Sequence, residues 1–341
     1  MKIKRGDIYY IDLYLEPGKI SDHNKRSNGT LSFTGVELMD AIVSAGMPDI
    51  YLNKANKRNR KEEIYFKIKL FETYVALSPN GELLFDPARK VYLDSTEIGA
   101  INYWIGMILT TVLGKKKYGY EYMVHLSMVL KLSSQPPIEK HRFLSANGKT
   151  TYKSPDLIAI NNSNRYYGVF ESKGYSTYSS NAMERGYIQA KSIDKINGKP
   201  PKNSLVVMTV TGKRIEITEK DPEGGTTQIK VNLSFLQMYH YLPIVELIME
   251  LCPEEQENWT FGSLVYEEEK YSIGIPTVLY KELLPIAEGK EENLLDEFLE
   301  KISSKETYLL DIVPDEARQH ILHVKYIFYL LLVHLCYDFL L

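Results

Sequence analysis

Cysteine is nearly absent from this sequence, and its scarcity limits the class of protein. Only two of the 341 residues are cysteines, at positions 252 and 336. Two isolated cysteines form neither a disulfide framework nor a cysteine-based zinc site, which excludes small disulfide scaffolds and zinc-finger modules. The first seven residues are largely charged and lack the apolar core of a secretory signal. We therefore expect a cytoplasmic protein.

The sequence also lacks the glycine-rich loop that cradles nucleotide phosphates and the Gly-x-Ser-x-Gly turn of serine hydrolases. These absences argue against an intrinsic ATPase and against a common class of hydrolase. The apolar run near the C-terminus also falls short of membrane length. The strongly apolar stretch at residues 326–337 is shorter than a bilayer span and contains His334. We expect this stretch to form a core or dimer helix, and we expect no membrane anchor.

The sequence has no large excess of charge of either sign. It contains 41 lysines and arginines and 44 acids, which give a net charge of −3. A protein that binds nucleic acid then needs a local basic surface rather than a basic total. Two basic runs, at residues 57–61 and 115–117, could contact phosphate, although such runs are more often solvated loops. The candidate residues are Lys57, Arg58, Arg60 and Lys116.

The most informative feature that is present consists of two short polar motifs on neighbouring apolar runs. Pro155-Asp156 opens the apolar run at residues 157–160, and Glu171-Ser172-Lys173 closes the run at residues 166–170. We expect two buried strands joined by a turn at residues 161–164. Side chains at i and i+2 leave the same face of a strand, so Glu171 and Lys173 should point together, with Asp156 across from them.

Each motif taken alone indicates little, because both recur elsewhere in the chain. Glu-x-Lys is repeated at residues 268–270 and 288–290, and Pro-Asp is repeated at residues 48–49 and 314–315. Those copies lie in charged or turn-like surroundings that are typical of solvated surface or helix caps. Only the pair at 155–173 lies on apolar runs and is followed directly by Gly174. A structural salt bridge remains the alternative to a catalytic site.

The chemistry of these residue types favours a metal-assisted reaction. Burying two carboxylates and an ammonium at the end of a hairpin costs free energy, so such groups are expected where they have a functional role. Mg²⁺ prefers carboxylate oxygens and retains several waters. A neighbouring lysine can orient the attacking water and offset developing negative charge. The set Asp156, Glu171 and Lys173 therefore predicts a divalent-metal site that activates water toward a phosphate.

This pattern resembles the PD-(D/E)XK nuclease superfamily, which has the restriction-endonuclease-like fold, over residues 119–212. The resemblance implies a mixed α/β fold with an αβββαβ core, in which a mixed central sheet is flanked by helices. It also implies hydrolysis of phosphodiester bonds with Mg²⁺, for which Mn²⁺ would substitute. Asp156 and Glu171 would bind the metal and Lys173 would assist the water.

The flanking segments extend the resemblance. We expect a helix at residues 119–132 carrying Glu121 as a third acid, with Glu97 on an earlier helix as the competing candidate. An acid favoured by the dipole at a helix N-terminus is the plain alternative for Glu121. Residues 140–144 are expected to form the first strand, residues 181–193 a helix and residues 203–210 a buried strand. Related nucleases often place a Gln or Lys on that helix near the site. Gln189 and Lys191 are therefore candidates to contact nucleic acid, although a solvated helix face explains them equally well.

The chain is long enough for two domains or one elaborated domain. We expect a mixed α/β module at residues 1–95 for recognition or partner binding. A nuclease-like core is expected at residues 96–232. A mostly helical region should follow at residues 233–341, and its last helix is a candidate oligomer interface.

The sequence predicts a metal-dependent DNA endonuclease of restriction or anti-phage defence. A homodimer or larger assembly would give the two active sites that cut a duplex, and a partner protein of a defence system is a further expectation. One alternative is a DNA-binding or assembly protein whose nuclease fold is weakly active or inactive. Another alternative is an RNA-cutting toxin.

Overall fold

The computed structural model describes nearly all of the first 288 residues. The described ranges are 1–45, 59–126, 141–144, 150–161, 165–222, 227–229, 231, 233–267 and 269–288, with positions 297 and 300. Within them the chain is mixed α/β and divides into two compact units, residues 1–56 with 64–231 and residues 57–63 with 232–341. The predicted mixed α/β class is confirmed.

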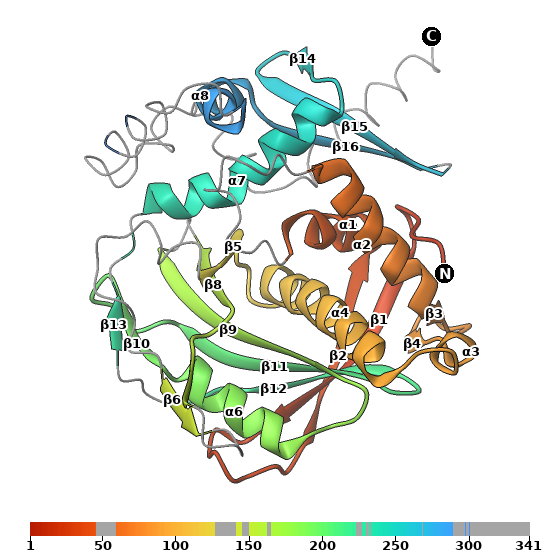
Figure 1. Cartoon of the computed structure of the whole chain (residues 1–341), viewed down its shortest axis with the longest axis vertical. Coiled ribbons are helices and arrows are strands. Elements are labelled where there is room, and N and C mark those ends of the chain that lie inside the picture. Colours follow the sequence, from red (N-terminus) through yellow and green to blue (C-terminus); the bar gives the residue numbers. More distant parts are fainter. Residues whose placement is uncertain are drawn as a thin grey trace. The chain divides into compact units, whose positions relative to one another are not determined.

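The first unit is built on a seven-stranded mixed sheet (Figure 1). Two neighbouring pairs in this sheet are parallel, β1 with β12 and β9 with β11, whereas the other neighbours are antiparallel. In spatial order the strands are β2 (Arg26–Thr34), β1 (Ile8–Glu16), β12 (Ile215–Lys220), β11 (Asn203–Thr211), β9 (Tyr166–Tyr175), β8 (Leu157–Asn161) and β5 (Tyr122–His125).

The central strands read as continuous apolar runs because the sheet is covered on both faces. Every residue of β8 is buried, and so are eight consecutive residues of β11, from Ser204 to Thr211. A strand with only one covered face would instead alternate between apolar and polar residues. The apolar runs that predicted the strands at residues 157–160 and 203–210 therefore also indicate two covering layers.

Helix α4 (Ser95–Lys116) covers one face of β9 and β11, and helix α6 (Ser180–Ala190) covers the other (Figure 1). The alternation along β9 separates the two layers. Ser172 meets Thr110 of α4, with 3.0 Å between the two hydroxyl oxygens. Lys173 points the other way and packs its stem near Gly186 of α6. Because Glu171 shares the face of Lys173, both motif side chains lie beneath α6.

The remaining elements of the first unit are short or peripheral. They are α1 (Gly35–Ser44), most of α2 (Arg60–Tyr74), α3 (Pro87–Lys90), and three two-stranded sheets: β3 (Val75–Leu77) with β4 (Leu83–Phe85), β6 (His141–Leu144) with β7 (Thr150–Lys153), and β10 (Ile193–Ile196) with β13 (Thr227–Ile229).

The second unit has its own three-stranded antiparallel sheet and two helices that pack on it. These elements are α7 (Leu233–Glu250), which contains Pro243, β14 (Glu254–Gln256), β15 (Trp259–Tyr266), β16 (Glu269–Pro276) and α8 (Thr277–Glu288). The boundary between the units, at residues 231 and 232, lies next to the predicted boundary at 233. The helix predicted for the apolar stretch at residues 326–337 lies outside the described residues.

The prediction of a separate module at residues 1–95 is wrong. Strand β1 pairs in parallel with β12 and thereby joins the central sheet, with Asp12 opposite Glu216 and Glu16 opposite Lys220. Strand β12 in turn lies between β1 and β11. A parallel pair between segments 200 residues apart leaves no local pattern in the sequence, which is why the boundary was misplaced.

The helix predicted at residues 119–132 is also wrong in its described part. Residues 122–125 form strand β5, which pairs with β8 from Tyr122 opposite Ile160 to His125 opposite Leu157. Tertiary pairing along the free edge of β8 outweighs the local helical propensity of this segment. The predicted first strand at residues 140–144 instead forms β6, which pairs with β7 outside the central sheet. By contrast, α6 and β11 appear where the sequence predicted them.

Among the described residues, helix α4 is the one helix long and apolar enough to cross a membrane by length and composition. Of its most apolar window, 67% is buried within the protein. A core helix of a soluble protein passes the same test, and α4 packs across β9 and β11 in that way. Its apolar character is therefore explained by its place between the sheet and α1.

Candidate metal centre

Asp156 and Glu171 are brought together by the antiparallel pairing of β8 and β9. The last paired residues are Leu157 and Phe170, so one further step along both strands places Asp156 opposite Glu171. The Asp156 carboxylate then replaces the missing backbone partner: its Oδ2 accepts the N–H of Ser172 at 2.9 Å. Beyond this point no described strand pairs with residues 172–175 on the β8 side. The site therefore lies just before the start of β8, where the neighbouring edge of β9 has no partner strand among the described residues.

Lys173 is held by two oxygen acceptors from different elements. Its Nζ donates to Glu171 Oε1 and, at 3.1 Å, to Gln189 Oε1 of α6. The Gln189 amide in turn donates from Nε2 to the carbonyl of Ser154 at 3.2 Å. Gln189 thus links the lysine to the segment that precedes Asp156. This placement ties α6, β8 and β9 together around the predicted motif.

Glu171 carries the strongest electrostatic perturbation at the site. Its side chain is 1% exposed, and burial together with the nearby Asp156 raises the pKa of its carboxyl to about 8, against the opposing effect of Lys173. Burial alone would lower the pKa of Lys173, but Glu171 and Asp156 raise it above its ordinary value. Among the described residues, Glu171 Oε2 is buried without a hydrogen-bond partner. A buried carboxylate oxygen that lacks a protein partner is a position where a water or an ion can bind.

The residues present fit a hard divalent cation. Two adjacent carboxylates, one with an unsatisfied oxygen, match the one or two carboxylates that Mg²⁺ takes while it keeps several waters. The part of the chain that the structure describes contains no cluster of three His, Cys, Asp or Glu in a metal-binding arrangement. The described site therefore offers Asp156 and Glu171 but no third acidic ligand.

Neither predicted third acid joins these two carboxylates. The backbone N–H of Glu121 donates to Ile160, at the end of β8 opposite from Asp156, whose carbonyl accepts from Leu126. The four residue steps from Asp156 to Ile160 span roughly 13 Å along a strand. The role predicted for Glu121 is therefore not supported, because β5 runs antiparallel to β8 instead of forming a helix across it. Glu97 instead closes a capping box with Asp94 at the start of α4.

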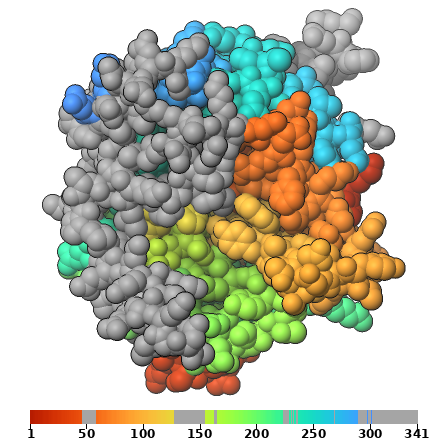
Figure 2. All heavy atoms as spheres, in the orientation of Figure 1, coloured from red at the N-terminus to blue at the C-terminus, as the bar shows by residue number. Residues whose placement is uncertain are grey.

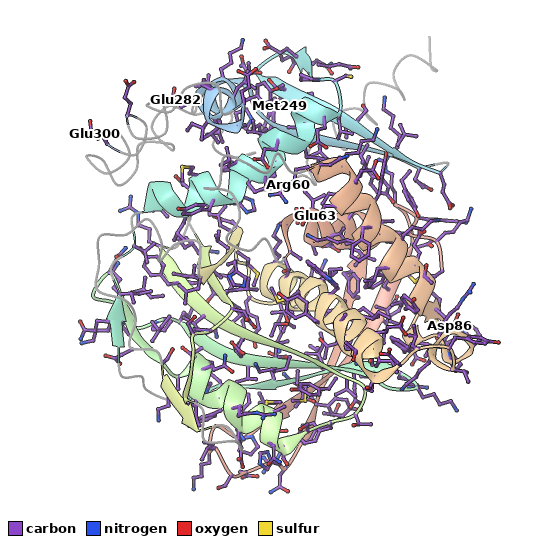
Figure 3. All side chains as sticks on the ribbon, viewed as in Figure 1. Arg60, Glu63, Asp86, Met249, Glu282 and Glu300 are labelled. Carbon is purple, nitrogen blue, oxygen red and sulfur yellow. The ribbon has the colours of Figure 1, made fainter. Side chains whose placement is uncertain are left out.

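Arg60 does not form the predicted basic surface. Its side chain is 1% exposed and pairs with Glu63 at 2.6 Å and with Glu246 of α7 at 2.9 Å. Figure 3 shows Arg60 next to Glu63 at the start of α2. The backbone N–H of Arg60 also donates to Glu250 at 2.8 Å. The arginine is therefore a structural residue of the second unit. Lys57 and Arg58 lie outside the described residues.

The predicted basic run at residues 115–117 is matched by acids on neighbouring elements. Lys116 pairs with Glu37 of α1 at 2.8 Å, and its neighbours Lys115 and Lys117 pair with Asp40 and Glu219. This run fastens α4 to α1 and β12, so the structure offers no support for a phosphate contact at Lys116. Lys191 follows the end of α6, with its ammonium 5.8 Å from the centre of the Tyr187 ring.

One residue near the carboxylates was not singled out in the sequence. Burial raises the pKa of the Tyr103 hydroxyl, and the charges of Asp156 and Glu171 raise it further, which places this α4 side chain within their field. Its ring is 41% exposed. A tyrosine in a helix expected to lead into the core carries no signal of its own, so only the packing of α4 on β9 reveals it.

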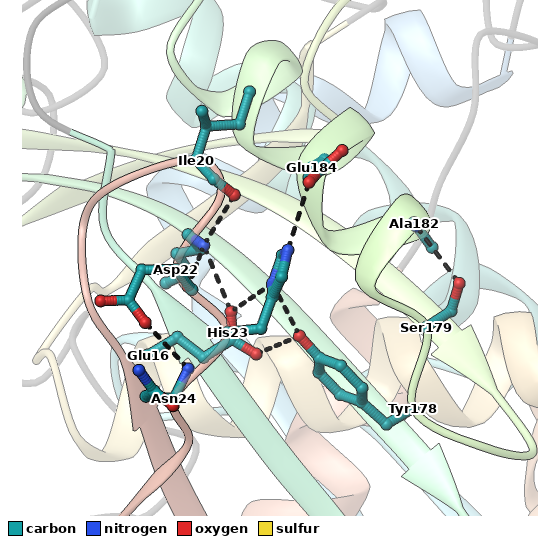
Figure 4. Close-up of polar contacts among 10 residues, drawn as sticks. Glu16, Ile20, Asp22, His23, Asn24, Tyr178, Ser179, Ala182 and Glu184 are labelled. Carbon is teal, nitrogen blue, oxygen red and sulfur yellow. Dashed lines mark hydrogen bonds and ion pairs between the residues drawn. The ribbon is translucent and has the colours of Figure 1, made fainter.

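A second buried polar cluster joins the loop after β1 to β12 and to α6 (Figure 4). Lys220, which is fully buried, donates to Glu16 at 3.3 Å and to the carbonyls of Ile20 and Asp22 at 3.2 and 2.7 Å. Glu16 also accepts from the hydroxyl of Tyr178. The ammonium thereby uses its three hydrogens to hold the loop after β1.

His23 connects that loop to α6. Its Nδ1 lies 3.3 Å from Glu16 Oε2, and its Nε2 lies 3.2 Å from Glu184 Oε1 on the helix. Because the two carboxylates lie on opposite sides of the imidazole ring, this arrangement bridges elements and does not gather ligands around one point. The cluster around Lys220 is therefore structural, in contrast to the centre at Glu171.

No protein-family model matches the chain, and no curated protein or solved structure is similar to it at a significant level.

Proposed function

We propose that this protein is a metal-dependent endonuclease that hydrolyses phosphodiester bonds of DNA. The observation that carries the proposal is the buried Glu171, whose Oε2 has no partner among the described residues while Asp156 and Lys173 adjoin it. The succession α4, β5, β8, β9, α6 and β11 also follows the αβββαβ order of the restriction-endonuclease-like core that the motif resembles, apart from the inserted strands β6, β7 and β10.

The residues divide the chemistry between them. Asp156 and Glu171 would hold Mg²⁺, which supplies charge stabilisation and a bound water of lowered pKa when present. Lys173 keeps its proton at neutral pH because its pKa is raised, so it acts as a cationic donor and not as a base. In that role it orients the nucleophilic water and offsets the charge that develops on the phosphate. Gln189 positions the ammonium through its 3.1 Å hydrogen bond.

The biological setting of the proposal rests on the resemblance of the motif alone. A nuclease of this kind would serve in restriction or anti-phage defence in the cytoplasm. Cutting both strands of a duplex requires two active sites or one that acts twice, and a homodimer meets that need. A partner protein of the same defence system belongs to this proposal as well.

The test is cleavage of plasmid DNA in the presence of Mg²⁺. We expect wild type to cut, and we expect Asp156→Ala, Glu171→Gln and Lys173→Ala to lose activity by at least about 100-fold. Glu255→Gln is the matched control, because Glu255 forms an exposed ion pair with Lys281 in the second unit and should leave cleavage unchanged. Equal cleavage by wild type and Asp156→Ala would refute the proposed site. Parallel assays with single-stranded DNA and RNA distinguish a DNA endonuclease from an RNA-cutting toxin.

A further inference from the structure

Helix α4 approaches β9 closely at the residue after Lys173. A Cβ atom on Gly174 would lie 1.9 Å from the carbonyl oxygen of Asn102 and 3.0 Å from the nitrogen of Tyr103. A Cβ atom on Gly106 would lie 3.3 Å from the Gly174 Cα. Only glycine at position 174 allows this contact without displacing the backbone. The helical turn that carries Tyr103 is therefore fixed one residue beyond the catalytic lysine.

Side-chain hydrogen bonds hold the same turn in place. Asn102 is 2% exposed, and its Nδ2 donates to the hydroxyl of Ser176 at 3.1 Å, just after β9. The hydroxyl of Thr211, at the end of β11, donates to the Asn102 Oδ1. These bonds connect the turn to the ends of both strands. The backbone of Tyr103 therefore has little freedom relative to the metal centre.

The backbone of Tyr103 adjoins Gly174, in the stretch of β9 that no described strand pairs on the β8 side. Glu171 and Lys173 belong to the face under α6, whereas Tyr103 comes from the α4 side. Burial, Asp156 and Glu171 all raise the pKa of the phenol, so it stays protonated at neutral pH. Figure 2 shows the surface of α4 adjoining that of the segment that contains β9 and α6.

The hydroxyl of Tyr103 is available to donate a hydrogen bond to a ligand. It makes no hydrogen bond within the part of the chain that the structure describes, although its ring packs edge-on against Trp104 with centroids 5.3 Å apart. That contact restrains the ring. An exposed, oriented phenol next to a centre that attracts phosphate through a metal is suited to a phosphate oxygen.

We propose that Tyr103 is a phosphate-binding residue, which donates a hydrogen bond from its hydroxyl to a backbone phosphate of the nucleic acid bound at Asp156 and Glu171. The inference rests on the proposed function, and it identifies a contact from α4 to the sugar-phosphate backbone. Stacking of the ring on a base is the competing use of an exposed tyrosine. The two uses differ in whether the hydroxyl or the ring is required.

Substitutions of Tyr103 separate the hydroxyl from the ring. Tyr103→Phe removes only the donor and should lower kcat/KM for plasmid cleavage by roughly 10- to 100-fold, the range for a hydrogen bond to a charged group. Tyr103→Ala should lose little more than Tyr103→Phe. Tyr92→Phe is the matched control, because Tyr92 is 86% exposed and precedes α4. Wild-type activity in Tyr103→Phe overturns the proposal, whether or not Tyr103→Ala is impaired.

A binding measurement distinguishes failure of the inference from failure of the proposed function. Binding of duplex DNA is measured with Ca²⁺ in place of Mg²⁺ at several salt concentrations. Tyr103→Phe should weaken binding without changing the salt dependence, because a phenol carries no charge, whereas Lys173→Ala should reduce that dependence. If wild type binds DNA but does not cut it, the endonuclease proposal fails. The comparison of DNA binding by wild type and Tyr103→Phe still tests whether Tyr103 contacts the phosphate. Unchanged binding in Tyr103→Phe overturns the contact itself.

Discussion

Ionisation of Glu171 should couple Mg²⁺ binding to pH. With a pKa of about 8, the metal-free carboxyl is roughly 10% ionised at pH 7 and roughly 90% ionised at pH 9. Mg²⁺ requires the carboxylate, so its apparent affinity should rise about tenfold between these pH values. Binding should release about 0.9 proton at pH 7 and about 0.1 proton at pH 9.

Titration calorimetry in two buffers of different ionisation enthalpy measures this proton release directly. Glu171→Gln should abolish the pH-dependent component, and Glu255→Gln should bind as wild type does because its ion pair is remote and exposed. An affinity that is the same at pH 7 and pH 9, with no proton released at either, would show that Glu171 is already ionised. Such a result would remove the electrostatic reason for assigning the metal to this carboxylate.

The same pKa also predicts the sign of a change in stability. The folded value of about 8 lies above the ordinary 4.5, so the protonated carboxyl contributes stability that is fully present below pH 4.5 and is lost as pH rises through 8. The full loss is on the order of 5 kcal/mol. Without metal, Tm should therefore fall from pH 6 to pH 9, and Mg²⁺ should restore it. Glu171→Gln should flatten this profile, and a wild-type Tm that rises over this range contradicts the burial argument.

Two further substitutions test the packing around the site. Gly174→Ala should lower the free energy of unfolding by about 1–3 kcal/mol in urea titrations, because its Cβ would overlap the Asn102 carbonyl. Gly99→Ala on the same helix meets nothing within 4 Å and should be neutral or stabilising, so equal effects of the two would refute the close approach. Lys220→Met leaves the buried Glu16 without its cation and should cost about 3–5 kcal/mol in the same assay. A cost below about 1 kcal/mol would mean that water replaces the ammonium.

The part of the site that the sequence predicted is the part made by local pairing. Asp156 and Glu171 lie on consecutive strands of one antiparallel pair, so their apolar runs and the period of a strand were enough to place them together. Gln189 follows on the next helix, and its 3.1 Å contact with Lys173 lies within the same short stretch of chain. Local pattern and tertiary structure agree over these 35 residues.

The parts that the sequence could not predict depend on contacts between distant segments. The pairing of β1 with β12 joins residues about 200 positions apart, and Arg60 meets Glu246 across a similar distance. The sequence alone does not distinguish a basic residue that is solvated from one that is buried against an acid. Glu121 was misplaced for a related reason, because only pairing with β8 decides that its segment is a strand.

A comparison of two buried glutamates on one row of the sheet supports the assignment of the metal centre. Glu16 lies opposite Lys220, Lys220 opposite Val206, and Val206 opposite Glu171, so the two acids share a row across β1, β12, β11 and β9. Each acid is 1% exposed. Lys220, His23 and Tyr178 surround the Glu16 carboxylate, so that both of its oxygens are paired. Glu171 accepts a hydrogen bond from Lys173 at one oxygen and has no partner at the other within the described residues. The fold thus satisfies a buried carboxylate where the role is structural, and it leaves one oxygen unsatisfied beside Asp156, where a cation would complete the site.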